Sequence, residues 1–172
     1  MQPQHMRPQG REWQDAAGRA AVVAAIVQAV KVGDAALQQE AVDALGRLVS
    51  DHHDNKSAAA AAGAVPHVMQ LTKSSNVALQ ELALNALGSL FSNHRDNQSA
   101  ANAAGGIPHL MKLTKSNNAS IQQHAFTALG SLVWNHHDNQ SVAAAAGAVP
   151  HLMQLTKSSN AHIQMQAFSN LI

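Results

Sequence analysis

A near-exact internal repeat of 42 residues constrains the fold of this chain more than any other feature of its sequence. Residues 96–135 are reproduced almost letter for letter when the sequence is shifted by one period in either direction. Because each copy of such a repeat buries its apolar side chains only against its neighbours, the period predicts a stack of units. Proline and glycine recur at fixed places in the copies, at Pro66, Pro108 and Pro150 and at Gly46, Gly88 and Gly130.

The period divides the 172 residues into four units. Residues 1–10 are rich in Gln, Pro and His, so we expect them to form a mobile tail ahead of an array over 11–172. The first unit is predicted to be a divergent terminal cap, because Ala21 and Ala24 stand where later units have Gly and Pro. The predicted unit boundaries are 12–53, 54–95, 96–137 and an incomplete 138–172.

The spacing of apolar residues predicts an all-α chain. Leu, Val, Ile and Met recur at helical intervals, Ala is abundant, and aromatic residues make up only 3% of the sequence. No segment has the alternation of a strand. In the first unit the helical pattern begins at Glu12 and runs to Lys31.

Three helices are predicted in the second unit. Asp54 is placed to cap a short helix over residues 55–62, and Gly63 can end that helix in the left-handed conformation. Pro66 suits the start of a second helix. The third helix is predicted over 77–92, and its apolar stripe is expected to form the core through Leu79, Ala83, Leu84, Leu87, Leu90 and Phe91.

The third and fourth units repeat this plan, with third helices predicted over 119–134 and from His162 onward. Gly88 and Gly130 lie inside third helices, where Gly costs about 1 kcal/mol relative to Ala. Their recurrence indicates that neighbouring helices approach closely there.

The order of a short helix, a Gly break, a second helix that begins with Pro and a long third helix resembles the armadillo repeat. Residues 61–90 and their copies at 103–132 and 145–171 carry the resemblance. HEAT repeats are the nearest alternative, but they have two helices, and the separate short helix argues against them. The resemblance implies a right-handed armadillo-type α-solenoid, a superhelix of three-helix repeats. It also implies that the third helices line a concave groove that binds extended peptides.

The groove face of the predicted third helices carries mostly small and polar side chains. The alternative is a merely solvated helix face, but differences between the near-identical copies fall disproportionately on these positions. We take the following as candidate partner-binding residues: Gln39, Asp43, Arg47, Glu81, Asn85, Ser89, Gln123, Thr127, Ser131 and Trp134.

Trp134 replaces Ser50 and Ser92 of the sister units. A large aromatic side chain beside a groove often dominates the free energy of binding. It could equally cover the end of its helix, so both interpretations stay open.

Histidine and aspartate recur together, as in His52, His53 and Asp54, and such residues can bind zinc. Neighbouring units are separated by about 8–10 Å, so three clusters one unit apart cannot converge on one ion. We therefore expect no metal site and assign Asp54, Asp96 and Asp138 as helix caps. His67, His109 and His151 are expected on the outer surface.

The sequence argues against several other functions. It has no Cys and no recognisable catalytic motif, so we expect neither an enzyme nor a cofactor. Its formal net charge of +1 is too balanced for a typical nucleic-acid-binding protein. No apolar run is long enough to span a membrane, and no secretory or acylation signal is present, so the cytosol or nucleus is expected.

Two functions remain. The first is a non-enzymatic scaffold that binds an extended segment of a partner protein in the groove. The alternative is an N-terminal fragment of a longer array, which self-associates or docks further repeats through an uncapped C-terminal end. That end would leave Phe168 and Leu171 partly uncovered.

Overall fold

The computed structural model describes residues 9–157 and Gln164. The predicted tail over 1–10 lies almost entirely outside the described residues, as do Phe168, Leu171 and the start of the predicted helix at His162. Within the described part there are helices and no strands, which confirms the all-α prediction. The helices are α1 (Gln9–Val32), α2 (Ala35–Val49), α3 (His53–Ala61), α4 (Ala64–Leu71), α5 (Val77–Phe91), α6 (Arg95–Ala103), α7 (Gly106–Leu113), α8 (Ala119–Val133), α9 (His137–Ala145) and α10 (Ala148–Leu155).

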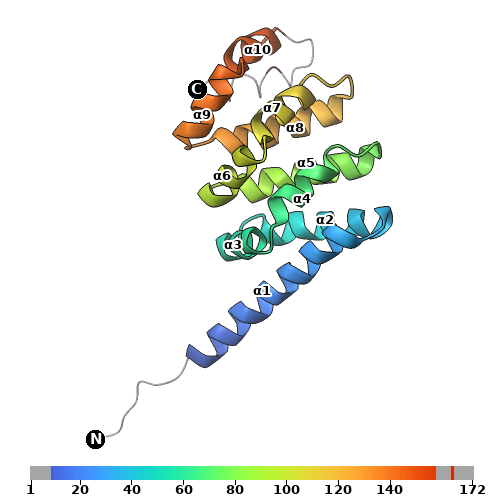
Figure 1. Ribbon diagram of the computed structural model, residues 1–172, viewed down its shortest axis with the longest axis vertical. Helices are drawn as coiled ribbons and strands as arrows, with labels where there is room; N and C mark the ends of the chain where they lie inside the picture. The colour runs from blue at the N-terminus through green and yellow to red at the C-terminus, as the bar shows by residue number, and fades with distance from the viewer. Residues whose placement is uncertain (1–8, 158–163, 165–172) are drawn as a thin grey trace, which may run out of the picture.

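The helices are arranged as a solenoid of stacked layers (Figure 1). The long third helices α2, α5 and α8 pack side by side in sequence order. The turns that connect α1 to α2, α4 to α5 and α7 to α8 all lie along one edge, on the right of the view. The short helices α3, α6 and α9 lie at the opposite edge. The predicted armadillo-type solenoid is therefore the observed fold.

Within a repeat, the observed bounds agree with the predicted ones to within two residues. Gly63 separates α3 from α4 in the left-handed conformation, with a φ of 75°, as the sequence predicts. Gly105 and Gly147 do the same in the next two copies, with φ of 75° and 84°. A residue with a Cβ is disfavoured in this conformation, so the glycine fixes the sharp turn between the two helices.

The first unit differs from the others in having one long helix in place of two. The helix α1 is continuous from Gln9 to Val32. Ala21 and Ala24 hold the positions of the turn glycine and the proline, so no residue breaks the helix. The first unit therefore diverges from the others in structure as well as in sequence, because one continuous helix replaces two.

The core lies between the layers and is built from repeated apolar positions. The predicted stripe of α5, from Leu79 to Phe91, is fully buried, and so are Phe126 and Leu132 of α8. Gly46 of α2 allows α5 to approach, since a Cβ at Gly46 would lie 3.4 Å from the Cα and Cβ of Ala86. Gly46 therefore favours a close spacing between α2 and α5.

The predicted aspartate caps of the short helices are wrong. The N-cap residues are His52, His94 and His136. The Nδ1 atom of His94 accepts a hydrogen bond from the backbone N–H of Asn97 at 3.3 Å. The aspartates sit in the first turn instead, where their negative charge favours the positive end of the helix dipole.

Candidate functional site

Nine of the ten predicted partner-binding residues lie at four-residue intervals along α2, α5 and α8, and Trp134 directly follows α8. We call all of them the groove residues. On α2, Asp43 and Arg47 form an ion pair, with 2.8 Å between the carboxylate Oδ2 and the guanidinium Nη2. The pair is separated by one helical turn, and Gln39 lies one turn before it. This part of the face therefore presents both signs of charge close together.

On α5 the face carries one acidic side chain, Glu81, and two neutral polar ones. Asn85 is exposed, whereas Glu81 and Ser89 are partly buried. An exposed amide can donate and accept hydrogen bonds at once, which suits contact with a peptide main chain.

On α8 the same positions hold Gln123, Thr127 and Ser131. The hydroxyl of Thr127 donates to the backbone carbonyl of Gln123 at 3.3 Å. A Cβ built at Gly88 of α5 would lie 3.7 Å from Cγ2 of Thr127. This is an ordinary van der Waals distance, so the polar rows of α5 and α8 lie beside one another here.

Trp134 follows the last residue of α8, and 64% of it is exposed to solvent. The end of α8 is capped by a different residue. The Nε2 group of Gln98 donates to the carbonyl oxygens of Ser131 at 2.8 Å and of Trp134 at 3.0 Å. The indole ring is therefore not needed to cover the helix end, and most of its surface is open to a partner.

The sequence interpretation missed this capping position. Lys56 occupies the equivalent place one repeat earlier, and its Nζ donates to the carbonyl oxygen of Ser92 at 2.6 Å. Burial lowers the pKa of Lys56, an effect that Asp51 partly offsets. The available signal was a long polar side chain at the same place in each copy, at Lys56, Gln98 and Gln140.

The prediction that His109 and His151 lie on the outer surface is wrong, although His67 is exposed as expected. The Nε2 atom of His109 lies 2.7 Å from the Thr72 hydroxyl oxygen. The Nε2 atom of His151 lies 2.9 Å from that of Thr114. Each of these pairs joins two consecutive repeats. The sequence does not indicate these pairs, because the two partners of each are 37 residues apart along the chain.

The imidazoles at the opposite edge also link repeats. The rings of His53 and His94 come from consecutive units, and their centroids are 4.9 Å apart. The Nε2 atom of His94 lies 3.1 Å from the hydroxyl of Ser57. Burial lowers the pKa of His94, and His53 and Lys56 add to the effect, whereas Asp96 opposes it. Within the described residues, no three histidine or acidic side chains are grouped as a metal site would require.

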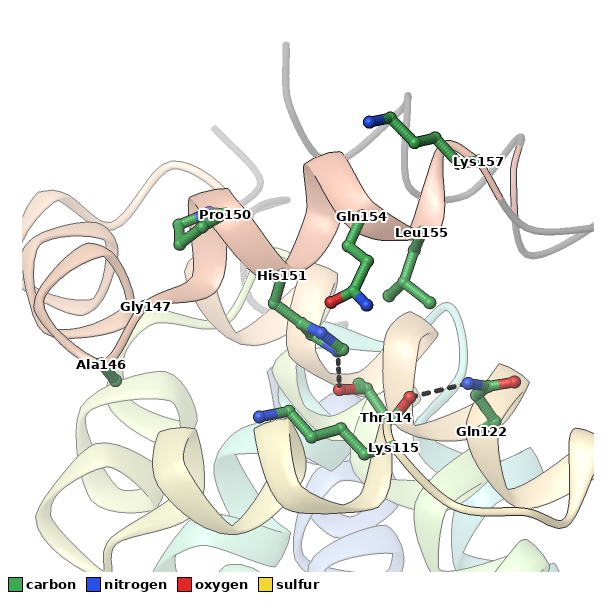
Figure 2. A pocket seen from close by; sticks show the side chains of 10 residues that line it. All are labelled: Thr114, Lys115, Gln122, Ala146, Gly147, Pro150, His151, Gln154, Leu155 and Lys157. Carbon is green, nitrogen blue, oxygen red and sulfur yellow. Dashed lines mark hydrogen bonds between the residues drawn. The ribbon is translucent and has the colours of Figure 1, made fainter.

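A pocket of about 730 Å³ lies between the third and fourth repeats, beneath α10 (Figure 2). Lys115 lies below it and Lys157 above it, while Pro150 and Leu155 supply apolar surface. The bond between His151 and Thr114 crosses the space between the layers. The pocket is separate from the groove residues, because none of them lines it.

None of the helices in the described residues combines the length and the apolar character that crossing a membrane requires.

Comparison with known proteins assigns the repeat. The sequence model of the Armadillo/beta-catenin-like repeat matches residues 52–92 and 94–134. Comparison with the sequences of curated proteins gave no match.

Solved structures share the fold. An engineered protein is 28% identical with a TM-score of 0.81, and the match covers 87% of this chain and 60% of that one. A designed armadillo repeat protein in complex with the peptide (KR)4 is 20% identical with a TM-score of 0.81, over 88% of this chain and 63% of that one. Computationally designed armadillo repeat proteins for modular peptide recognition are 18% identical with a TM-score of 0.78, over 87% and 63%. This chain thus spans less than two thirds of the length of each of these structures.

Two consecutive copies of the repeat match the sequence model of the family, and the described residues share the fold of its designed members, so the chain is an armadillo repeat protein.

Proposed function

We propose that the protein is a non-enzymatic scaffold that holds an extended segment of a partner protein along the groove residues of α2, α5 and α8. The observation that carries the proposal is the exposure of Trp134 at the end of a continuous polar row. Its ring is 64% exposed although it follows a helix whose end is already capped by Gln98. A rigid aromatic side chain in this position supplies a large contact area at low entropic cost.

The rest of the row suits a peptide main chain. Asn85 and Gln123 can donate to and accept from an extended backbone, and the row recurs once per repeat. Designed proteins with this fold are described as bound to the peptide (KR)4 and as made for modular peptide recognition, which supports the same mode here. Because the groove is preformed by helix packing, the scaffold loses little conformational entropy on binding.

The test is selection from a random peptide library displayed on phage, with the intact chain as bait. We expect Trp134→Ala to weaken binding of the selected peptides about tenfold or more. Val32→Ala is the control, because Val32 is an apolar residue of similar exposure in α1, which carries none of the groove residues. Equal losses in both variants, or selection of no peptide, would contradict the proposal.

A second candidate function is structural, and the exposure of α10 favours it. Met69 and Met111 are 5% and 6% exposed, because the following repeat covers them, whereas Met153 at the same place in the next copy is 58% exposed. A Cβ at Gly106 would lie 3.4 Å from Cε of Met69, which shows how this methionine reaches the following unit. The α10 face would therefore accept a helix pair like α6 and α7, supplied by a further armadillo repeat or by a second copy of the chain.

Light scattering over a range of concentrations separates the two candidates. Under the structural alternative the chain associates, and Met153→Glu abolishes association while leaving binding of selected peptides intact. Val32→Glu serves as the control for a new charge on an exposed apolar position. A monomer at all concentrations would exclude self-association through α10.

A further inference from the structure

Lysines recur at one edge of the solenoid, once in every repeat. Lys31, Lys73, Lys115 and Lys157 are each one period apart and each lies at the end of a second helix or, in α1, at its equivalent. These positions precede the third helices, so they fall on the edge that carries the α4–α5 and α7–α8 turns (Figure 1). Lys31 already donates to the carbonyl oxygen of Ala62 at 2.7 Å. We call the other three lysines of this series, together with Lys112 of α7, the lysine edge: Lys73, Lys112, Lys115 and Lys157.

Within the described residues, no ion pair involves a lysine of the lysine edge. Among residues 82–157 the only acidic residues are Asp96 and Asp138. Both lie in the first turns of short helices, at the opposite edge of the solenoid. Within the described residues the one ion pair shorter than 4 Å joins Asp43 to Arg47 on α2. The lysine edge thus carries no acidic residue in the third and fourth repeats, although Asp34 caps α2 at the same edge in the first.

The lysines are close enough to act on common neighbours. Burial lowers the pKa of His109, and the charges of Lys73 and Lys112 lower it further. Burial also lowers the pKa of His151, with a further contribution from Lys115. Both imidazoles that join the repeats therefore lie near lysines of this edge.

The pocket of Figure 2 opens between two of these lysines. Lys115 and Lys157 contribute to its lining from the third and fourth repeats. Gln154 points into the space between them, and Leu155 and Pro150 form apolar walls. All four lysines of the edge are exposed. The volume of about 730 Å³ is enough for a few side chains of a bound segment.

We propose that the lysine edge is a second interaction surface, which binds an acidic protein segment in extended conformation with a carboxylate at about every third residue. Consecutive repeats are spaced by about 8–10 Å, as packed helices are. Three residues of an extended chain span about 10 Å. Carboxylates three residues apart therefore match Lys73, Lys115 and Lys157 in register, and Lys112 adds charge between two of them.

The chemistry favours a peptide over other anions. The lysine edge is narrow and follows the stack, and the pocket beside it offers apolar walls and an amide as well as charge. An acidic peptide uses all of these features, since it has side chains and a main chain to place against them. A bare polyanion uses only the charge, and such binding is more strongly weakened by salt.

The test measures fluorescence anisotropy of a labelled peptide of four Glu-Ser-Gly triplets with the intact chain. We expect Lys115→Glu to weaken binding about tenfold, because a favourable pair is replaced by a repulsive one. Arg95→Glu is the matched control. It makes the same change in net charge at an exposed site on the opposite edge, so binding should change less than about twofold. Trp134→Ala should leave binding of this peptide unchanged, which separates this surface from the groove residues.

Register is tested with a peptide of the same composition whose four Glu residues are contiguous, and it should bind more weakly. Failure of the triplet peptide to bind, equal losses from Lys115→Glu and Arg95→Glu, or equal affinity for both peptides would each overturn the proposal. So would tighter binding of duplex DNA or of phosphatidylserine vesicles through the same lysines. Lys115→Gln removes the charge without adding a new one, so its loss of affinity for the triplet peptide should be intermediate. Circular dichroism establishes that the variants are folded.

Discussion

The imidazole of His109 donates from Nε2 to the hydroxyl oxygen of Thr72, 2.7 Å away, and so joins two consecutive repeats. The direction of the bond follows from the other contact of the hydroxyl. Thr72 uses its own hydrogen to donate to the carbonyl oxygen of Met69, also at 2.7 Å. The oxygen can then only accept from His109. His151 and Thr114 repeat the arrangement one period later, because Thr114 donates to Met111.

Replacing Thr72 by Val should destabilise the stack by about 1–3 kcal/mol, because Thr72 is fully buried and the change leaves His109 Nε2 without its acceptor. Urea unfolding measures the loss. Thr156→Val is the matched control, since the Thr156 hydroxyl donates to Met153 in the same way but the residue is only half-buried. A loss no larger than that of the control would mean that the bond between repeats contributes nothing.

The free energy of unfolding should fall as the pH is lowered from about 7.5 to 5. Burial lowers the folded-state pKa of His109 and His151, helped by Lys73 and Lys112 at the first and by Lys115 at the second. His94 is shifted in the same direction. The unfolded chain therefore binds protons first on acidification, so stability is complete above the unfolded pKa of about 6.5 and is lost as the pH falls through the lower folded values.

Urea titrations at several pH values measure this slope. His109→Gln should reduce it, because glutamine can still donate to Thr72 but cannot be protonated in this range. His67→Gln is the control, as His67 holds the same place in the previous repeat and is exposed. A slope that is unchanged by His109→Gln would exclude this histidine as its source.

The architecture could be predicted from the sequence because its determinants are local and repeated. Gly63 and Pro66 mark the same turn in every complete copy, and the apolar stripe of α5 has the period of a helix. In a stacked repeat these local signals also fix the long-range packing, since each unit meets only a copy of itself. The helix bounds and the core residues could therefore be predicted from the sequence alone.

The helix caps could not be predicted from residue preference alone. Asp96 is a favoured capping residue, but Asn93 ends the preceding helix in a left-handed conformation with a φ of 54°. That turn brings His94 to the cap position two residues before Asp96. The recurrence of Asn before His at 93–94 and 135–136 was the signal that sequence preference overlooked.

The bonds between repeats and the lysine edge were also missed, for a different reason. The pairing of Thr72 with His109 depends on which faces meet when two layers stack, and a repeated letter carries no such information. The net charge likewise adds up residues that lie apart in space, so it does not show where the lysines gather. The groove residues remain a prediction, since exposure on a common face is necessary for binding but does not identify a partner.

Leu129→Ala should lower the free energy of unfolding by about 2–5 kcal/mol, because Leu129 is buried at the centre of α8 and truncation leaves a cavity between layers. Leu37→Ala is the matched control at an exposed position near the start of α2, and we expect it to cost less than about 1 kcal/mol. Thermal or urea unfolding can check both. Similar losses in the two variants would mean that the assigned core face of α8 is wrong.

Gly105→Ala should cost about 1–2 kcal/mol through backbone strain alone. Gly105 has a φ of 75°, and nothing lies within 4 Å of where its Cβ would be, so crowding does not contribute. Gly105→Asn should cost less, because asparagine tolerates the left-handed conformation better than alanine. Urea unfolding of the pair measures the difference. If asparagine were as destabilising as alanine, strain at this turn would not be the cause.

Gln98→Ala should destabilise the chain by about 1–3 kcal/mol and speed amide exchange near the end of α8. Gln98 is 3% exposed and caps this helix through the carbonyls of Ser131 and Trp134, so its loss leaves two partly buried acceptors without this donor. Gln140→Ala is the control, because Gln140 holds the same place in the next copy but is exposed. Gln98→Lys should restore much of the loss, since Lys56 makes the equivalent contact to Ser92 at 2.6 Å. Restoration of stability by lysine would show that the helix end requires a long donor from the short helix of the same repeat. Failure of lysine to restore stability would show that the amide itself is needed.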